Sequence, residues 1–145
     1  MSALHALQST LERHGRDVAA LVLRVGFSLF MVLNHGWPKL LKFPAKHLTF
    51  SDPLGVTPTV SMALAVFGEL VCPLLILVGL LTRLASVPAA FTMFIAAVVV
   101  HKDDRLGDGE HALLYAIAFA AIFLLGPGRF SLDRVFKKRL GVLGG

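Results

Sequence analysis

A long apolar run of the chain contains a single acidic side chain near its middle. Glu69 and Cys72 are the only ionisable side chains of residues 60–81. About 20 apolar residues span the hydrocarbon core of a bilayer, and an ionised carboxylate at that depth is costly unless it is paired or neutralised. We therefore interpret Glu69 as a residue with a specific role, either in a binding site or in holding helices together.

Arg24 is the predicted partner of Glu69. It is the only Lys, Arg, Asp or Glu of the apolar segment 19–37, and it falls on the same helical face as His35. At the rise of an α-helix, Glu69 and Arg24 lie about 15 and 20 Å below the same membrane surface, within reach of an arginine side chain. A buried Arg24–Glu69 pair lets both residues stay charged. The alternative is that Arg24 alone extends to the opposite surface.

Further polar residues are predicted to gather above this pair. They fall at the ends of the apolar segments on one side of the membrane: His35, Lys39, His101, Glu110 and His111. A histidine at such a position can relay a proton near neutral pH. We expect a polar vestibule there. The candidate ligand-binding residues are Arg24, Glu69, His35, Lys39, His101 and Glu110, and the candidate catalytic residues are Glu69, His35 and His101.

Each of these residues also has a simpler structural interpretation. The histidines are typical of membrane interfaces, and a lysine such as Lys39 often anchors a helix end by reaching toward water. The vestibule residues, with Asp103 and Asp104, include metal-ligand types but lack the tight spacing of a metal site, so no metal is predicted. Cys72 is expected to pack in the membrane, where a thiol is a poor nucleophile.

The composition places the chain among integral membrane proteins. Of its 145 residues, 56% are hydrophobic and 16% are charged, whereas soluble proteins carry roughly 25% charged residues. A protein this small cannot bury so much apolar surface in a soluble core. The net charge of +5 comes without a Gly-rich phosphate loop or basic–aromatic interleaving, so no nucleic-acid partner is predicted. Residues 1–17 are polar and no A-x-A-like site follows, so we expect no cleaved signal peptide.

Four membrane-spanning helices in a single domain, residues 1–145, would position these side chains in the lipid bilayer. The apolar segments predict spans at 19–37, 59–81, 84–100 and 112–126. The tight connection at Thr82 and Arg83 predicts an antiparallel hairpin of the second and third spans. Pro73, four residues after Glu69, predicts a kink there. We therefore expect an all-α, integral membrane four-helix bundle.

Short interfacial helices are predicted at both termini. Residues 2–15 and 131–140 combine an apolar face with a polar one, as helices on a membrane surface do; a frayed tail is the alternative for the first. Ser131 is the expected N-cap of the second. Residues 38–58 contain four prolines and predict a kinked interfacial helix and loop. Lys and Arg are more numerous in the two tails and the 82–83 turn than in the opposite loops, which predicts cytoplasmic N- and C-termini.

Several motifs together resemble the DoxX/DoxD family. They are Arg24, His35-Gly36-x-x-Lys39-Leu40, Phe67-Gly68-Glu69, Gly79-Leu80-Leu81-Thr82-Arg83, His101, Glu110-x-Ala112-Leu113-Leu114 and Gly126-Pro127-Gly128-Arg129-Phe130-Ser131-Leu132-Asp133. The resemblance covers about residues 18–133. His111 departs from the pattern, since the family more often has an aromatic residue after the acid, and the 102–109 loop is more acidic than usual.

The resemblance implies a four-helix protein of the bacterial inner (plasma) membrane, of a kind often named an oxidoreductase. The DoxD branch is a subunit of thiosulfate–quinone oxidoreductase, and other members are linked to detoxification partners or have no known activity. For this chain it implies a redox-associated subunit that binds a quinone or a similar amphiphile at the Arg/Glu/His site, together with a soluble or membrane redox partner. No haem or flavin motif is present.

Two other functions fit the same residues. In one, the chain is a non-enzymatic membrane scaffold, in which Arg24–Glu69 holds the bundle and the basic C-terminal helix recruits a soluble partner. In the other, it transports a small solute through the vestibule. Four spans are few for a transporter, so this function requires a homo-oligomer. A flat amphiphile beside Arg24 and Glu69 would favour the redox hypothesis, and a closed, dry ion pair would favour the scaffold.

Overall fold

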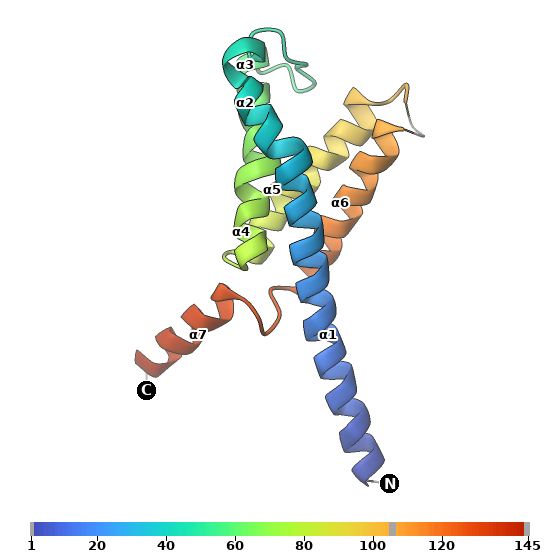
Figure 1. The fold of residues 1–145 in the computed structure, drawn as a ribbon, viewed down its shortest axis with the longest axis vertical. Helices are drawn as coiled ribbons and strands as arrows, with labels where there is room; N and C mark the ends of the chain where they lie inside the picture. Colours follow the sequence, from blue (N-terminus) through green and yellow to red (C-terminus); the bar gives the residue numbers. More distant parts are fainter. Residues whose placement is uncertain (1, 105–106, 144–145) are drawn as a thin grey trace.

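The protein is a bundle of helices (Figure 1). The computed structural model describes residues 2–104 and 107–143, which contain no strand. Four helical stretches in this part of the chain are long and apolar enough to cross a membrane: Leu7–Lys46, Pro58–Val78, Thr82–Val100 and Asp108–Leu125. The all-α membrane bundle predicted from the sequence is therefore confirmed.

Three of these stretches contain a π-helical turn, labelled η. In chain order the described elements are α1 (Ser2–Met31), η1 (Val32–Gly36), α2 (Trp37–Lys46), α3 (Pro58–Val66), η2 (Phe67–Val71), α4 (Cys72–Val78), α5 (Thr82–Ile95), η3 (Ala96–Val100), α6 (Asp108–Leu125) and α7 (Leu132–Leu143). We call the end with α2, α3 and the start of α6 the upper end, and the end with α7 the lower end (Figure 1).

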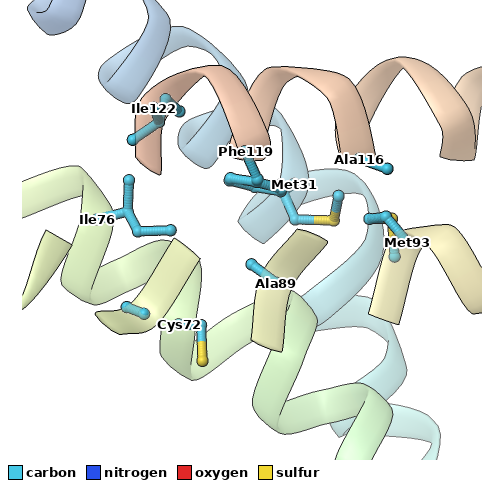
Figure 2. Close-up of a cluster of buried hydrophobic side chains, with 9 residues drawn as sticks. Met31, Cys72, Ile76, Ala89, Met93, Ala116, Phe119 and Ile122 are labelled. Carbon is cyan, nitrogen blue, oxygen red and sulfur yellow. The ribbon is translucent and has the colours of Figure 1, made fainter. Parts of the chain in front are cut away.

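Helices α1, α4, α5 and α6 pack in a closed ring. In this ring α1 contacts α4 and α6, and α5 contacts the same two helices from the other side. Their inward faces share one core, in which side chains of α4, α5 and α6 converge on Met31 and Phe119 (Figure 2). Cys72 is buried in this core, as expected. The outward faces expose many Leu, Val and Phe side chains, which suits a surface that faces lipid.

The first helix is longer than the sequence predicts. Residues 2–15 form the start of α1 rather than a separate helix, and the helical path continues beyond Trp37 to Lys46. Pro38 does not end it because the π turn η1 comes first: the Trp37 N–H donates to the Val32 carbonyl, and Pro38 then occupies the first turn of α2. The stretch from Leu7 to Lys46 is about 60 Å long at 1.5 Å per residue, twice the thickness of a hydrocarbon core.

A π-helical turn also lies where Pro73 predicted a kink. The Cys72 N–H donates to the Phe67 carbonyl across η2, and Pro73 follows in the first turn of α4. Glu69 is therefore carried by a widened turn. The π geometry inserts an extra residue into the helix and changes the direction in which the following side chains point, which is why such turns are frequent at functional sites.

The second and third spans form the predicted antiparallel hairpin. α4 ends at Val78 and is capped by Gly79, which has a positive φ of 74°, and α5 begins at Thr82. Leu81 also has a positive φ, 51°. At the other end of this pair, α5 and α6 lean away from α2 and α3, so the two upper halves of the bundle diverge (Figure 1).

Candidate functional site

An ion pair joins the first two spans inside the bundle. Lys39 Nζ in α2 donates to Glu69 Oε1 in η2. Glu69 is only 3% exposed, whereas the Lys39 side chain keeps 23% of its surface exposed. The Lys39 ammonium also lies 5.5 Å from the ring centroid of Phe50, close enough for a cation–π attraction. Glu69 thus has a cationic partner in the membrane, but the partner is Lys39.

Two glycines bring the backbones close enough to form this pair. η1 and η2 lie side by side, and a Cβ on Gly36 would clash with the carbonyl oxygen of Glu69. On the other side of η2, a Cβ on Gly68 would clash with Thr92 of α5. Small residues permit such close helix approach in membranes. The depth of Glu69 relative to the first span is therefore fixed by backbone contact at Gly36.

One oxygen of the Glu69 carboxylate has no partner among the described residues. Oε1 accepts from Lys39, whereas Oε2 is buried without a hydrogen bond. A buried polar atom without a partner is destabilising, more so when it carries charge. A proton or a hydrogen-bond donor from outside the protein would remove that cost. The pair therefore presents an unused acceptor next to a partly exposed ammonium donor.

Lys39 lines an open cleft of ≈ 400 Å³ at the upper end. One wall comes from η1 and α2, with Asn34, His35, Lys42 and Lys46 among its residues; the other comes from the loop at Thr49–Ser51 and from Met62 of α3. None of its described lining residues is acidic. The cleft is therefore cationic, with Lys39 next to the Glu69 carboxylate and two further lysines along the same helix.

Asp52 shapes the loop that forms the second wall. Its carboxylate accepts hydrogen bonds from the Ser61 hydroxyl (2.6 Å) and from the backbone N–H groups of Val56 (3.1 Å) and Thr57 (2.9 Å). These bonds favour the charged form, so the pKa of Asp52 is lowered, with the Ser61 bond the largest cause. Thr57 in turn caps α3 by accepting from the Val60 N–H.

His35 lies between the cleft and an aromatic cluster. It lines the cleft, and its ring meets the ring of Tyr115 edge-on at a centroid distance of 5.6 Å. Tyr115 also contacts Phe27 and stacks on Phe119 of the core. Glu69, Lys39, Asp108 and His111 lie within electrostatic range of His35. The structure therefore brings together His35, Lys39 and Glu69 of the predicted site.

Arg24 does not pair with Glu69, and this prediction is wrong. Arg24 is 2% exposed at the lower end, where its Nη1 donates to the Pro127 carbonyl and its Nη2 to the Phe130 carbonyl, both at 2.5 Å. The predicted depth of Arg24 in the membrane was wrong because the first helix continues past Trp37. Gly36 is the residue level with Glu69, and Arg24 lies about 18 Å further down the helix at 1.5 Å per residue.

Asp133, close to Arg24 at the lower end, joins the start of α7 to the turn between α4 and α5. Its carboxylate accepts from the N–H groups of Leu81 (2.7 Å) and Thr82 (2.9 Å), and its own N–H donates to the Gly79 carbonyl (2.8 Å). Asp133 lies within electrostatic range of Arg24. We call Arg24, the 79–82 turn and residues 127–133 the C-terminal lock. It fixes the start of α7 beneath the hairpin of α4 and α5.

Ser131 was expected to cap α7 through its side chain. Its hydroxyl instead donates to the Gly128 carbonyl at 2.9 Å, within the lock. Ser131 is buried there, and a Cβ on Gly79 would lie 2.6 Å from both Ser131 Cβ and Arg24 Nη1. The small residues of the lock are therefore needed for its close packing.

His101 and Glu110 lie at the top of the other half of the bundle. His101 ends η3, with its N–H bonded to the Ala96 carbonyl, and Glu110 is exposed in the first turn of α6. Within the described ranges no recorded contact joins either residue to Lys39 or Glu69. Across the same part of the chain, no group of three His, Cys, Asp or Glu side chains is arranged to hold a metal ion. Their predicted roles in ligand binding remain predictions.

Sequence reasoning missed several residues of the cleft. Lys42, Lys46 and Phe50 were assigned to an interfacial segment, yet they line the cleft with Lys39. Lys39, Lys42 and Lys46 follow at intervals of three and four residues, which places them on one face of a helix. This spacing indicates a shared helical face for the three lysines. It predicts the cleft wall only if α2 is recognised as a continuation of the first span.

One known protein family matches more than half of the chain. Residues 19–102, which include Arg24, His35, Lys39, Glu69 and His101, match the DoxX family. The chain belongs to the DoxX family. The resemblance recognised in the sequence is thereby confirmed, and this DoxX-family chain is a membrane protein with the helical bundle described above.

Several curated proteins are similar to this DoxX-family chain. An uncharacterized membrane protein of Mycobacterium tuberculosis is 41% identical over 91 residues, or 52% of this chain and 55% of that protein, so the chain spans about half the length of that relative. The inner membrane protein YphA of Escherichia coli is 30% identical, over 82% of this chain and 91% of YphA. The inner membrane protein YqjF of Escherichia coli is 27% identical, over 85% and 95%. No solved structure matches the chain significantly.

Proposed function

We propose that this membrane protein binds a quinone, or a similar flat amphiphile, in the upper cleft and serves as the membrane subunit of a redox system. The observation that carries the proposal is the Lys39–Glu69 pair: a buried carboxylate with one unused oxygen, next to a partly exposed ammonium that lines a cleft. Polar residues held at such depth in a membrane protein are most often part of a functional site.

The donors and acceptors of the cleft suit a carbonyl-bearing head group. Lys39 and His35 line it, and either can donate a hydrogen bond to a carbonyl oxygen. Glu69 does not line the cleft, but its unpaired Oε2 is buried beside the Lys39 ammonium and would accept a bond from a ligand hydroxyl that displaces Lys39. The Phe50 ring offers a flat apolar contact beside Lys39. These groups recognise a ring that carries both oxygen atoms and apolar surface.

A bound quinone would supply the capacity to accept or give electrons and protons. The residues around the cleft would hold and move the protons: His35 lies within electrostatic range of Glu69 and of the exposed top of α6. A route from Glu69 through His35 to the surface is consistent with this placement. The electrons would come from a soluble or membrane redox partner, because the sequence has no haem or flavin motif.

Fluorescence of Trp37 can test ligand binding directly. Trp37 is the single tryptophan of the chain and precedes the cleft residue Pro38. We expect a short-chain benzoquinone to quench it saturably in lipid nanodiscs. Glu69→Gln and Lys39→Met should each weaken the apparent affinity roughly tenfold, the loss of about one good hydrogen bond. Lys138→Gln, a charge removal on the exposed face of α7, is the matched control.

The quenching experiment has a clear opposing outcome. Quenching that rises linearly with quinone and is equal in all four proteins would mean that quinone only dissolves in the lipid, and the binding proposal would fail. The redox role needs a second assay. Quinone reduction by membranes that contain the wild-type protein should exceed reduction by membranes with Glu69→Gln, and equal rates would contradict the role as a redox subunit.

A membrane scaffold is the second candidate function, and the C-terminal lock favours it. The lock holds the root of α7, whose basic residues Arg134, Lys137 and Lys138 are exposed. A fixed basic helix would be a suitable attachment point for an acidic soluble protein. Crosslinking in intact membranes should then give a discrete heteromeric product that Lys137→Glu/Lys138→Glu abolishes. Products formed only between copies of this chain would contradict the scaffold and indicate a homo-oligomer.

We also propose that the protein lies in the bacterial inner membrane with both termini in the cytoplasm. The excess of Lys and Arg on the side of the tails supports this orientation, and the two inner membrane relatives support the compartment. A green fluorescent protein fused to the C-terminus should fluoresce, since it matures in the cytoplasm. A dark but exported fusion would reverse the orientation.

A further inference from the structure

We propose that a second pocket, at the lower end of the bundle, binds a phosphate group. The pocket has a volume of ≈ 350 Å³ and lies where α1, the end of α6 and the start of α7 meet. Three arginines line it: Arg16 from α1, Arg129 from the 126–131 turn and Arg134 from α7. It is remote from the Lys39–Glu69 cleft and independent of the function proposed there.

The fold, rather than chance exposure, brings these arginines together. Arg16 is more than a hundred residues away in sequence from the other two. Asp17 fixes the turn by accepting from the Arg129 backbone N–H at 3.1 Å. Gly128, with a positive φ of 71°, lies so close to α1 that a Cβ would sit 3.2 Å from the Ala20 Cβ. The C-terminal lock then sets the position at which α7, and with it Arg134, begins.

The charges in the pocket are not balanced by the protein. Asp17 is the only acidic residue among the described lining residues, and its second oxygen lies 3.8 Å from Arg129 Nε. Asp17 therefore offsets Arg129. Arg16 and Arg134 form no ion pair with any described residue, and the pocket keeps an excess of two positive charges. An anion is the ligand that this arrangement recognises.

Arginine favours phosphate over a simple monovalent anion. The guanidinium presents a planar set of donors that matches two phosphate oxygens at once, and it is readily desolvated. Two unpaired guanidinium groups facing one pocket can hold a phosphate from two sides. A phosphate group is therefore the chemistry we assign to the site.

A phospholipid head group is the nearest source of that phosphate. Leu125 lines the pocket, and the neighbouring Leu124 and Phe130 are exposed, as are Leu132, Val135 and Phe136 of α7. These apolar side chains would contact acyl chains while the arginines hold the head group, as basic pockets at membrane interfaces do. Free inorganic phosphate has the same chemistry and is the other source.

Thermal unfolding in phosphate-free micelles of a maltoside detergent tests the site. The wild-type protein is compared in these micelles alone, in the same micelles with phosphatidylglycerol, and in the same micelles with added inorganic phosphate. Arg16→Gln and Arg134→Gln remove the unpaired charges, while Lys137→Gln and Lys138→Gln remove equal charge from α7 without touching the pocket. All four residues are exposed, so the variants should fold.

We expect the melting temperature of the wild type to rise saturably with phosphatidylglycerol. Arg16→Gln and Arg134→Gln should raise the half-saturating fraction of that lipid roughly tenfold, the loss of about one charge-assisted bond, while the lysine variants stay near the wild type. A rise with inorganic phosphate in micelles without lipid, lost in the same arginine variants, supports the site with free phosphate as its source. Equal responses of arginine and lysine variants, or no response to either phosphate source, would overturn the proposal.

Discussion

The upper cleft and the C-terminal lock both bury charged side chains, but they use their hydrogen-bonding groups differently. At the lock, Arg24 donates to two backbone carbonyls and both oxygens of Asp133 accept backbone N–H groups, although Arg24 Nε and Thr82 Oγ1 are buried there without a hydrogen bond among the described residues. Beside the cleft, Glu69 uses one carboxylate oxygen and leaves the other unpaired, and the Lys39 ammonium that it binds lines the cleft. The lock therefore joins segments of the chain to one another and is suited to stability, whereas the cleft is open and is suited to holding something from outside.

Replacing Arg24 should produce the largest loss of stability. Arg24→Met removes two charge-assisted bonds and leaves the Pro127 and Phe130 carbonyls without these donors, a cost of about 3–6 kcal/mol at 1.5–3 kcal/mol per bond. Reversible unfolding in mixed detergent micelles measures it. Lys137→Met on the exposed face of α7 should change stability by no more than about 0.5 kcal/mol. Similar stabilities for the two variants would show that the lock is dispensable.

A methyl group at Gly36 should disturb the cleft from within. Gly36→Ala would force η1 away from the Glu69 carbonyl, and overpacking of this kind costs about 1–3 kcal/mol. Gly26→Ala is the matched control on the same helix, because a Cβ there has nothing within 4 Å; it should be neutral or stabilising by up to about 1 kcal/mol. Measured stabilities in the reverse order would contradict the close contact of η1 and η2.

Asp133→Asn should lower the stability of the protein without changing quinone binding at the cleft. An amide keeps the shape but loses an acceptor for the N–H groups of Leu81 and Thr82, which should cost about 0.5–2 kcal/mol, as for other helix caps. Saturable quenching of Trp37 by quinone should be unchanged, since the lock lies at the opposite end. Asp103→Asn, in the exposed loop, is the control for stability. Weaker quinone binding in Asp133→Asn would mean that the two regions are coupled.

The smallest expected effect is a dependence of stability on pH at Asp52. Its pKa is lowered in the folded protein, chiefly by the Ser61 hydroxyl, so its ionised form stabilises the fold above the unfolded pKa of about 4. That contribution is lost as pH falls through the lower folded pKa. Melting temperatures measured from pH 3 to pH 6 should fall less steeply in Asp52→Asn than in the wild type. Parallel curves would show that the loop gains nothing from the carboxylate.

Much of the fold could be predicted from the sequence because membrane spans have a strong apolar signal. The site was only partly predictable, since it depends on relative depth. Trp37-Pro38 is typical of a helix end, but the π turn η1 allows the helix to continue past Pro38. Arg24 therefore lies roughly one bilayer leaflet deeper than Glu69. The partners of Arg24 are backbone carbonyls, which carry no side-chain signal. The capping of α5 by Asp133 joins residues about fifty positions apart and has no local pattern.

Infrared difference spectroscopy of quinone binding tests the central claim most directly. The claim is that the unused oxygen of Glu69 contacts a ligand. Adding a short-chain benzoquinone to the wild-type protein in nanodiscs should perturb a carboxyl band that is absent from the difference spectrum of Glu69→Gln and retained in that of Asp133→Asn. A spectrum in which the wild type and Glu69→Gln are identical would show that Glu69 only joins two helices.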